Sequence, residues 1–189
     1  VLFIGHMANG TITNESPPPP PPPPLAAAAV TGRCSEDEVR RACGSQSLTR
    51  LQEAVQSGWT ASALDALSGG KSALQLAAWK GCLANVMYLV QQVKCDINHY
   101  STATYSFGKT PIFFALTQSR RDVVEYLLQQ EGIQVAIVNN KGQSVLSLAA
   151  THDMPDSILH QIQTLERHQT WWNFRATHSD GLHYGDLDP

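Results

Sequence analysis

The chain has 189 residues, of which 42% are hydrophobic and 15% are charged, and its formal net charge is −3. This composition predicts a mainly globular protein with one domain and an additional segment. A charge this small argues against the strong field that attracts nucleic acid or an anionic membrane. No stretch reaches the roughly 18 consecutive apolar residues that cross a bilayer. We therefore expect an intracellular protein, cytoplasmic or nuclear, for which neither nucleic acid nor a membrane is the favoured partner.

The N-terminal residues differ in composition from the rest of the chain. Residues 1–6 are interpreted as the remnant of an expression tag, with Met7 as the natural start. The segment 7–34 is rich in proline and alanine and contains the run Pro17–Pro24, which favours a polyproline II helix and cannot join a packed core. Such a run is either a ligand for SH3, WW, EVH1 or profilin-like domains or a stiff spacer.

The first predicted helix begins after Ser35. The acidic residues at 36–38 suit the positive end of a helix, and Gly44 suits its end. A second apolar cluster follows, so residues 35–69 are predicted to form a pair of helices. This unit departs from the pattern of the later ones, as expected of a repeat that covers the end of an array.

Three later segments share one pattern. The segments 72–78, 110–116 and 144–150 each open with Ser or Thr and continue with apolar residues, and their first residues are 38 and 34 positions apart. A second apolar cluster follows each Ser or Thr after about fourteen positions. Each unit is therefore predicted to contain two short helices, the first capped by the Ser or Thr. Because so small a unit cannot bury its own apolar face, the units must stack into an all-α solenoid, whose surface suits binding more than catalysis.

These segments resemble the ankyrin repeat family, whose signature opens with a Thr-Pro-Leu-His-type turn and a helix with two alanines. The resemblance covers residues 35–168 as four repeats, with approximate bounds 35–69, 70–107, 108–141 and 142–168. It implies helix pairs joined by β-hairpin-like fingers, with a protein or peptide partner bound along the fingers and the inner helices. The histidine of the motif is replaced by Gln75, Phe113 and Ser147, which predicts weaker coupling between the repeats.

The resemblance and the composition of the loops together give the candidate binding residues. The finger between the second and third repeats is four residues longer than the next and is rich in aromatic residues, which supply a large contact area at a small entropic cost. The ends of the inner helices of three repeats complete the predicted groove. The candidates are Trp79, Lys80, His99, Tyr100, Tyr105, Phe107, Thr117, Gln118, Thr151 and His152. Two alternatives stay open: the finger aromatics fold back over the core, or Trp79 packs against the finger.

Residues 169–189 are predicted to form an aromatic cap and a polar tail. The segment 171–174 reads Trp-Trp-Asn-Phe and is expected to fold over the last repeat, covering the apolar surface that a fifth repeat would bury. The polar residues beyond it are of the types that bind metal ions, but their irregular spacing favours solvated side chains. They are His178, Asp180, His183, Asp186 and Asp188.

The sequence predicts a binding module without catalysis or a cofactor. Residues 35–168 contain neither a glycine-rich phosphate loop nor a nucleophile elbow. Cys43 and Cys82 fall in helical patterns and are expected to be buried, unreactive side chains. The alternative is a substrate-recruiting or targeting domain of a larger enzyme whose catalytic part lies beyond residue 189.

Overall fold

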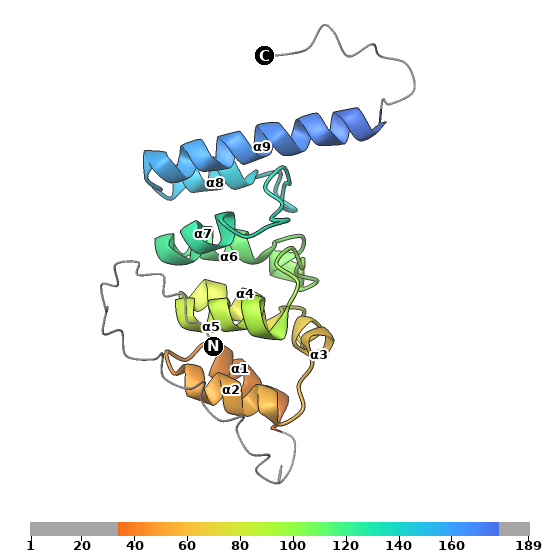
Figure 1. Ribbon diagram of the computed structural model, residues 1–189, viewed down its shortest axis with the longest axis vertical. Helices are drawn as coiled ribbons and strands as arrows, with labels where there is room; N and C mark the ends of the chain where they lie inside the picture. Colours follow the sequence, from red (N-terminus) through yellow and green to blue (C-terminus); the bar gives the residue numbers. More distant parts are fainter. Residues whose placement is uncertain (1–33, 178–189) are drawn as a thin grey trace, which may run out of the picture. The chain divides into compact units, whose positions relative to one another are not determined.

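The computed structural model describes residues 34–177, with side chains as far as Trp171. The predictions made for the tag remnant, the polyproline run and the polar residues at 178–188 lie outside this range. The described residues belong to one compact unit. Within it, four pairs of helices follow one another along the chain, as Figure 1 shows.

The first pair consists of α1 (Glu36–Cys43) and α2 (Leu48–Gln56). Ser35 caps α1 as predicted: its hydroxyl accepts a hydrogen bond from the Glu38 amide, and the Glu38 carboxylate accepts one from the Ser35 amide at 2.8 Å. This reciprocal arrangement satisfies two amides that a helix end leaves unpaired. Gly44 follows as the C-terminal cap.

A short helix that the sequence analysis did not predict, α3 (Ala61–Asp65), follows the first pair. The Thr60 hydroxyl accepts a hydrogen bond from the Ala63 amide at its start, and Leu64 is fully buried. Five residues are too few to form a stable helix alone, so its contact with the next repeat holds it in place.

The three remaining pairs match the predicted repeats. They are α4 (Ala73–Lys80) with α5 (Leu83–Tyr88), α6 (Pro111–Thr117) with α7 (Arg121–Leu128), and α8 (Val145–Thr151) with α9 (Asp156–Thr177). A π-helical turn, η1 (Leu89–Val93), continues α5. The first helices α1, α4, α6 and α8 contact one another in order, and so do the second helices α2, α5, α7 and α9. The described residues therefore form two layers of helices, which confirms the predicted all-α solenoid.

One apolar core runs through all four pairs. It includes Leu51 in the first pair, Leu74 in the second, Phe113 in the third and Ile162 in the last, all fully buried. Since each unit shares this core with its neighbours, the repeats stabilise one another.

Buried amide side chains join neighbouring repeats. The Asn85 amide group donates to the carbonyl oxygens of Ala42, Cys43 and Ser45 at 2.8–3.1 Å and so closes the end of α1 from the second repeat. The Gln75 amide group donates to the carbonyl oxygen of His99 at 2.7 Å.

The Gln75 side chain also bears on a prediction. The loss of the motif histidine predicts weaker coupling between repeats. Gln75 instead accepts a hydrogen bond from the Ser72 amide at 3.1 Å and donates a second bond, to the carbonyl oxygen of Lys109, at 3.3 Å. At this position hydrogen bonds between repeats are present, because glutamine carries both a donor and an acceptor and connects the helix cap with the next finger. The strength of the coupling stays a prediction.

The connections differ from the β-hairpin-like fingers that the resemblance implies. Residues 34–177 contain no strand, and a single isolated bridge joins Val138 and Ser144 in antiparallel orientation. The connections that lead from one pair to the next gather on one side of the helix pairs (Figure 1). The fingers are therefore loops closed by a few hydrogen bonds rather than extended ladders.

The C-terminal helix is longer than predicted. Neither glycine nor proline interrupts residues 156–177, so α9 continues past the repeat boundary predicted at 168. The aromatic segment therefore begins as part of α9 and not as a separate lid, and the Trp171 side chain is 42% exposed.

Candidate partner-binding surface

Residues 99–109, which belong to the connection between η1 and α6, are named the long finger here. Its backbone closes through two hydrogen bonds of 2.9 Å, from the Ser101 amide to the Lys109 carbonyl oxygen and from the Gly108 amide to the Ser101 carbonyl oxygen. The buried Ser101 hydroxyl donates to the carbonyl oxygen of Gly70 in the preceding connection at 2.7 Å. A 3-10 turn, η2 (Thr104–Ser106), forms part of the long finger. These bonds fix the long finger against the second repeat.

The long finger presents its aromatic side chains to solvent. Tyr105 is 95% exposed, Tyr100 is 59% exposed and Phe107 is 53% exposed. The rings of His99 and Tyr100 stack with their centroids 6.1 Å apart, and His99 is half-buried. Because these three large side chains lie mostly in water, the alternative in which they cover the core does not hold.

The other predicted residues lie at the ends of three consecutive first helices. Trp79 and Lys80 end α4, Thr117 and Gln118 lie at the end of α6, and Thr151 and His152 lie at the end of α8. Lys80, Gln118 and Thr151 are exposed, whereas Thr117 and His152 are half-buried. The hydroxyls of Thr117 and Thr151 donate to carbonyl oxygens one turn earlier in their own helices, so these two groups are already partnered.

Trp79 lies among cationic side chains. The Lys80 ammonium lies 4.8 Å from the centroid of the Trp79 ring, and the Lys71 ammonium lies 5.5 Å from it. The Lys71 ammonium also lies 5.8 Å from the ring centroid of Phe114, which belongs to the next repeat. Attraction between a cation and an aromatic face is worth about 0.5–1 kcal/mol at exposed sites. The Lys71 side chain thus lies between the end of α4 and helix α6 of the next repeat.

Sequence reasoning did not select Lys71, Lys109 or Lys141 for the site. Lys71 follows Gly70, and Lys109 follows Gly108, so both precede the Ser or Thr cap of a repeat. Burial lowers the pKa of Lys109, and repulsion from Lys141 and Lys71 lowers it further. The three ammonium groups therefore lie within electrostatic range of one another. The recurring Gly-Lys-Ser/Thr triplet was the signal that would have identified the first two.

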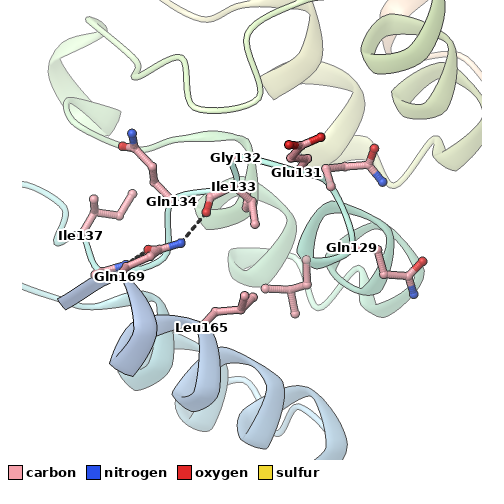
Figure 2. Close-up of a pocket in the computed structure, with 11 residues that line it drawn as sticks. Gln129, Glu131, Gly132, Ile133, Gln134, Ile137, Leu165 and Gln169 are labelled. Atoms are coloured by element: carbon pink, nitrogen blue, oxygen red, sulfur yellow. Dashed lines mark hydrogen bonds between the residues drawn. The ribbon is translucent and has the colours of Figure 1, made fainter. Parts of the chain in front are cut away.

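A separate hollow of about 660 Å³ lies between the connection 128–137 and α9 (Figure 2). The Gln169 amide reaches across it: its oxygen accepts from the Val135 and Ala136 amides at 2.8 and 2.9 Å, and its nitrogen donates to the Ile133 carbonyl oxygen. None of the predicted binding residues lines this hollow. The polar contacts of Gln169 hold α9 against the connection between α7 and α8. This is a structural role.

The buried thiols are unsuited to nucleophilic chemistry. Burial raises the pKa of Cys43 and of Cys95 to about 12, and Cys82 is 2% exposed. The thiolate, which is the reactive form, is therefore scarce at neutral pH. Among residues 34–171, no three His, Cys, Asp or Glu side chains gather where they could hold a metal ion.

Comparison with known families agrees with the fold. Residues 74–160 match the family described as ankyrin repeats, in three copies. This part of the chain therefore belongs to the ankyrin repeats, a class of domain that generally mediates protein–protein interaction. No curated protein matches the chain. Among the described residues, no helix is both long and apolar enough to cross a bilayer.

Proposed function

We propose that the protein is a non-catalytic interaction module that binds a protein or peptide partner through the long finger and the ends of the first helices. The exposure of Tyr100, Tyr105 and Phe107 on a hydrogen-bonded loop is the observation that carries this proposal. Large aromatic side chains exposed on a loop of this kind are typical of binding sites. Because the loop is already ordered, its aromatic side chains lose little entropy when a partner covers them.

Site-specific crosslinking tests the proposal. A photoreactive amino acid replaces Tyr105 in the full chain, and, as the control, Met87, which is exposed on the second helix of the second repeat. Irradiation in cell lysate is expected to give a discrete adduct from position 105 and none from position 87.

The same experiment includes a second arm. Replacing Trp79 and Tyr100 by alanine in the position-105 variant is expected to reduce the adduct several-fold while leaving the thermal unfolding midpoint within a few degrees. Equal adducts from positions 105 and 87, or an adduct that survives both replacements unchanged, would count against this surface.

Two further parts of the proposal concern the N-terminal segment and the location of the protein. We assign the run Pro17–Pro24 to recruitment of a polyproline-reading domain or to spacing, and its deletion decides between them: loss of SH3, WW or profilin-like partners identifies a ligand. An intracellular location, cytoplasmic or nuclear, goes with this function, since all four cysteines carry free thiols, as is usual in reducing compartments.

A further inference from the structure

Lys71, Lys109 and Lys141, here called the lysine row, lie at the bases of successive connections. The Thr102 amide donates to the carbonyl oxygen of Gly70 at 2.9 Å, and the Ser101 amide donates to that of Lys109 at 2.9 Å. Thr102 is thus hydrogen-bonded to Gly70, the residue before Lys71, and its neighbour Ser101 is hydrogen-bonded to Lys109. The long finger therefore holds the first two members of the row near each other.

The third lysine continues the row to the boundary with the fourth repeat. A Cβ atom placed on Gly108 would lie 3.6 Å from the backbone nitrogen of Asn140, so the chain just before Lys109 passes close to the chain just before Lys141. The mutual repulsion that lowers the pKa of Lys109 agrees with this placement. The row consequently runs from the start of the second repeat to the boundary between the third and the fourth.

No acidic side chain of the described residues neutralises the row. Among residues 34–171, the ion pair that the structure contains lies within α1, between Arg40 and Glu36 at 2.9 Å, and involves no lysine of the row. The charges that act on Lys109 are both lysines. Since the chain as a whole carries a net charge of −3, an uncompensated positive row beside Trp79 is a local feature of this surface.

The spacing of the repeats fits an extended chain. Packed helices lie about 8–10 Å apart, and an extended peptide in the polyproline II conformation advances about 3.1 Å per residue with about three residues per turn. Side chains three positions apart in such a peptide therefore lie on one face, about 9 Å apart, and match lysines at successive connections. The Trp79 ring, 5.5 Å from the Lys71 ammonium, lies beside the first of them and offers an apolar contact.

We propose that the lysine row and Trp79 bind an acidic, extended peptide segment of a partner protein, with carboxylates about three residues apart. This inference rests on the proposed function and specifies its partner. A peptide fits better than nucleic acid, because three lysines are few beside the six to ten phosphate contacts of salt-dependent nucleic-acid binding. The carboxylates of such a peptide pair with the ammonium groups, and an apolar side chain of the same peptide contacts the Trp79 ring.

The test is selection from random 12-residue peptides displayed on phage against the immobilised full chain. Enriched peptides are then labelled, and their affinity is measured by fluorescence anisotropy for the wild type and two variants. The row variant carries Lys71→Gln, Lys109→Gln and Lys141→Gln. The control variant carries Arg41→Gln, Arg50→Gln and Lys94→Gln, which remove the same charge from exposed positions elsewhere.

The selected peptides are expected to be rich in Asp and Glu at a spacing of three. The row variant is expected to bind them about tenfold or more weakly, because it loses three ion pairs with the peptide. The control variant is expected to bind them within about twofold of wild type. Binding should weaken as salt rises from 50 to 300 mM.

Selection of no peptides, selection without acidic enrichment, equal losses in both variants, or equal affinity for an oligo-dT strand of the same length would each overturn the inference. The crosslinking experiment separates this failure from failure of the proposed function. If the adduct from position 105 persists in the row variant, the finger surface stands and the acidic partner does not.

Discussion

At the scale of single residues, the buried Gln75 side chain couples the second repeat to the third. It makes one bond to the cap of its own helix and two to the carbonyl oxygens of His99 and Lys109. Replacing it with alanine leaves these buried groups without partners, at a cost of about 1–3 kcal/mol for such a group. We therefore expect Gln75→Ala to lower the free energy of unfolding by at least about 2 kcal/mol in urea titrations.

The matched control is Ser147→Ala, at the corresponding position of the fourth repeat. Ser147 is exposed, and its hydroxyl bonds only within its own helix start. Its replacement is expected to change stability by less than about 0.5 kcal/mol. Similar losses in the two variants would show that Gln75 does not connect the repeats.

Asp65 makes stability depend on pH. Burial raises the pKa of Asp65 above its ordinary value of 3.8. A hydrogen bond from the Asp96 amide and attraction to His99 both lower this pKa, but their effects are smaller. One carboxylate oxygen is buried without a partner. Because the folded state holds the proton more tightly than the unfolded state, protonating Asp65 stabilises the fold as pH falls through the raised pKa, and this stabilisation is lost as pH rises.

Asp65→Asn removes this titration while keeping an acceptor for the Asp96 amide. The variant is expected to be the more stable protein at pH 7.5, and its advantage is expected to shrink as pH falls toward 4.5. Urea unfolding of both proteins at several pH values gives the difference directly. An advantage that grows on acidification would mean that the carboxylate is stabilised, not penalised, by its surroundings.

At the scale of elements, the glycine before the lysine row allows the long finger to dock. Gly70 and Gly142 have nearly the same left-handed backbone, with φ of +72° and +71°. A Cβ atom on Gly70 would lie 2.4 Å from the backbone nitrogen of Ala103, whereas one on Gly142 would meet nothing within 4 Å. The two sites therefore separate backbone strain from the steric contact.

Gly142→Ala is expected to cost about 1–2 kcal/mol, the penalty of a left-handed residue with a Cβ atom. Gly70→Ala is expected to cost about 1–3 kcal/mol more, because the backbone of the long finger must move. Urea titration measures both, and hydrogen exchange at residues 101–109 reports whether the long finger has loosened. If the two costs are equal, the finger accommodates the methyl group without moving.

Helices with local signals could be predicted from the sequence, whereas contacts between repeats could not. The caps of α1 and α4 follow from Ser35 and Ser72 with their neighbours, and Pro111 marks the start of α6. These are interactions among residues three or four positions apart. Helix α3 and the clamp made by Gln169 depend on residues more than 30 positions away or on packing, so no local pattern announces them.

The candidate surface shows the same division. The aromatic composition of the long finger identified Tyr100, Tyr105 and Phe107, but their exposure depends on how the Ser101 hydroxyl fixes the loop to Gly70. The lysine row was missed because its members lie 38 and 32 positions apart in the sequence. Their charges come together only after stacking, since the fold brings the start of each repeat beside the next.

At the scale of the whole described unit, stability is shared between neighbours. Helices of one repeat contact their own partner and the adjacent repeats, and one core runs through all four pairs. In such an array the free energy is approximately a sum of repeat and interface contributions. The first repeat has one neighbour, whereas the third has two, so the effect of a core cavity should depend on its place along the array.

Two fully buried side chains test this dependence: Leu51 in α2 of the first repeat and Phe113 in α6 of the third. Leu51→Ala is expected to cost about 2–5 kcal/mol and Phe113→Ala about 3–5 kcal/mol.

Hydrogen exchange should show the effects of the two substitutions in different parts of the array. Leu51→Ala should speed exchange in 36–56 while 111–162 keeps its protection, because the last repeats retain their interfaces. Phe113→Ala should speed exchange on both sides, in α4 and in α8, because it weakens two interfaces at once. A uniform loss of protection in both variants would mean that the array unfolds as one unit, with interfaces so strong that no repeat opens alone.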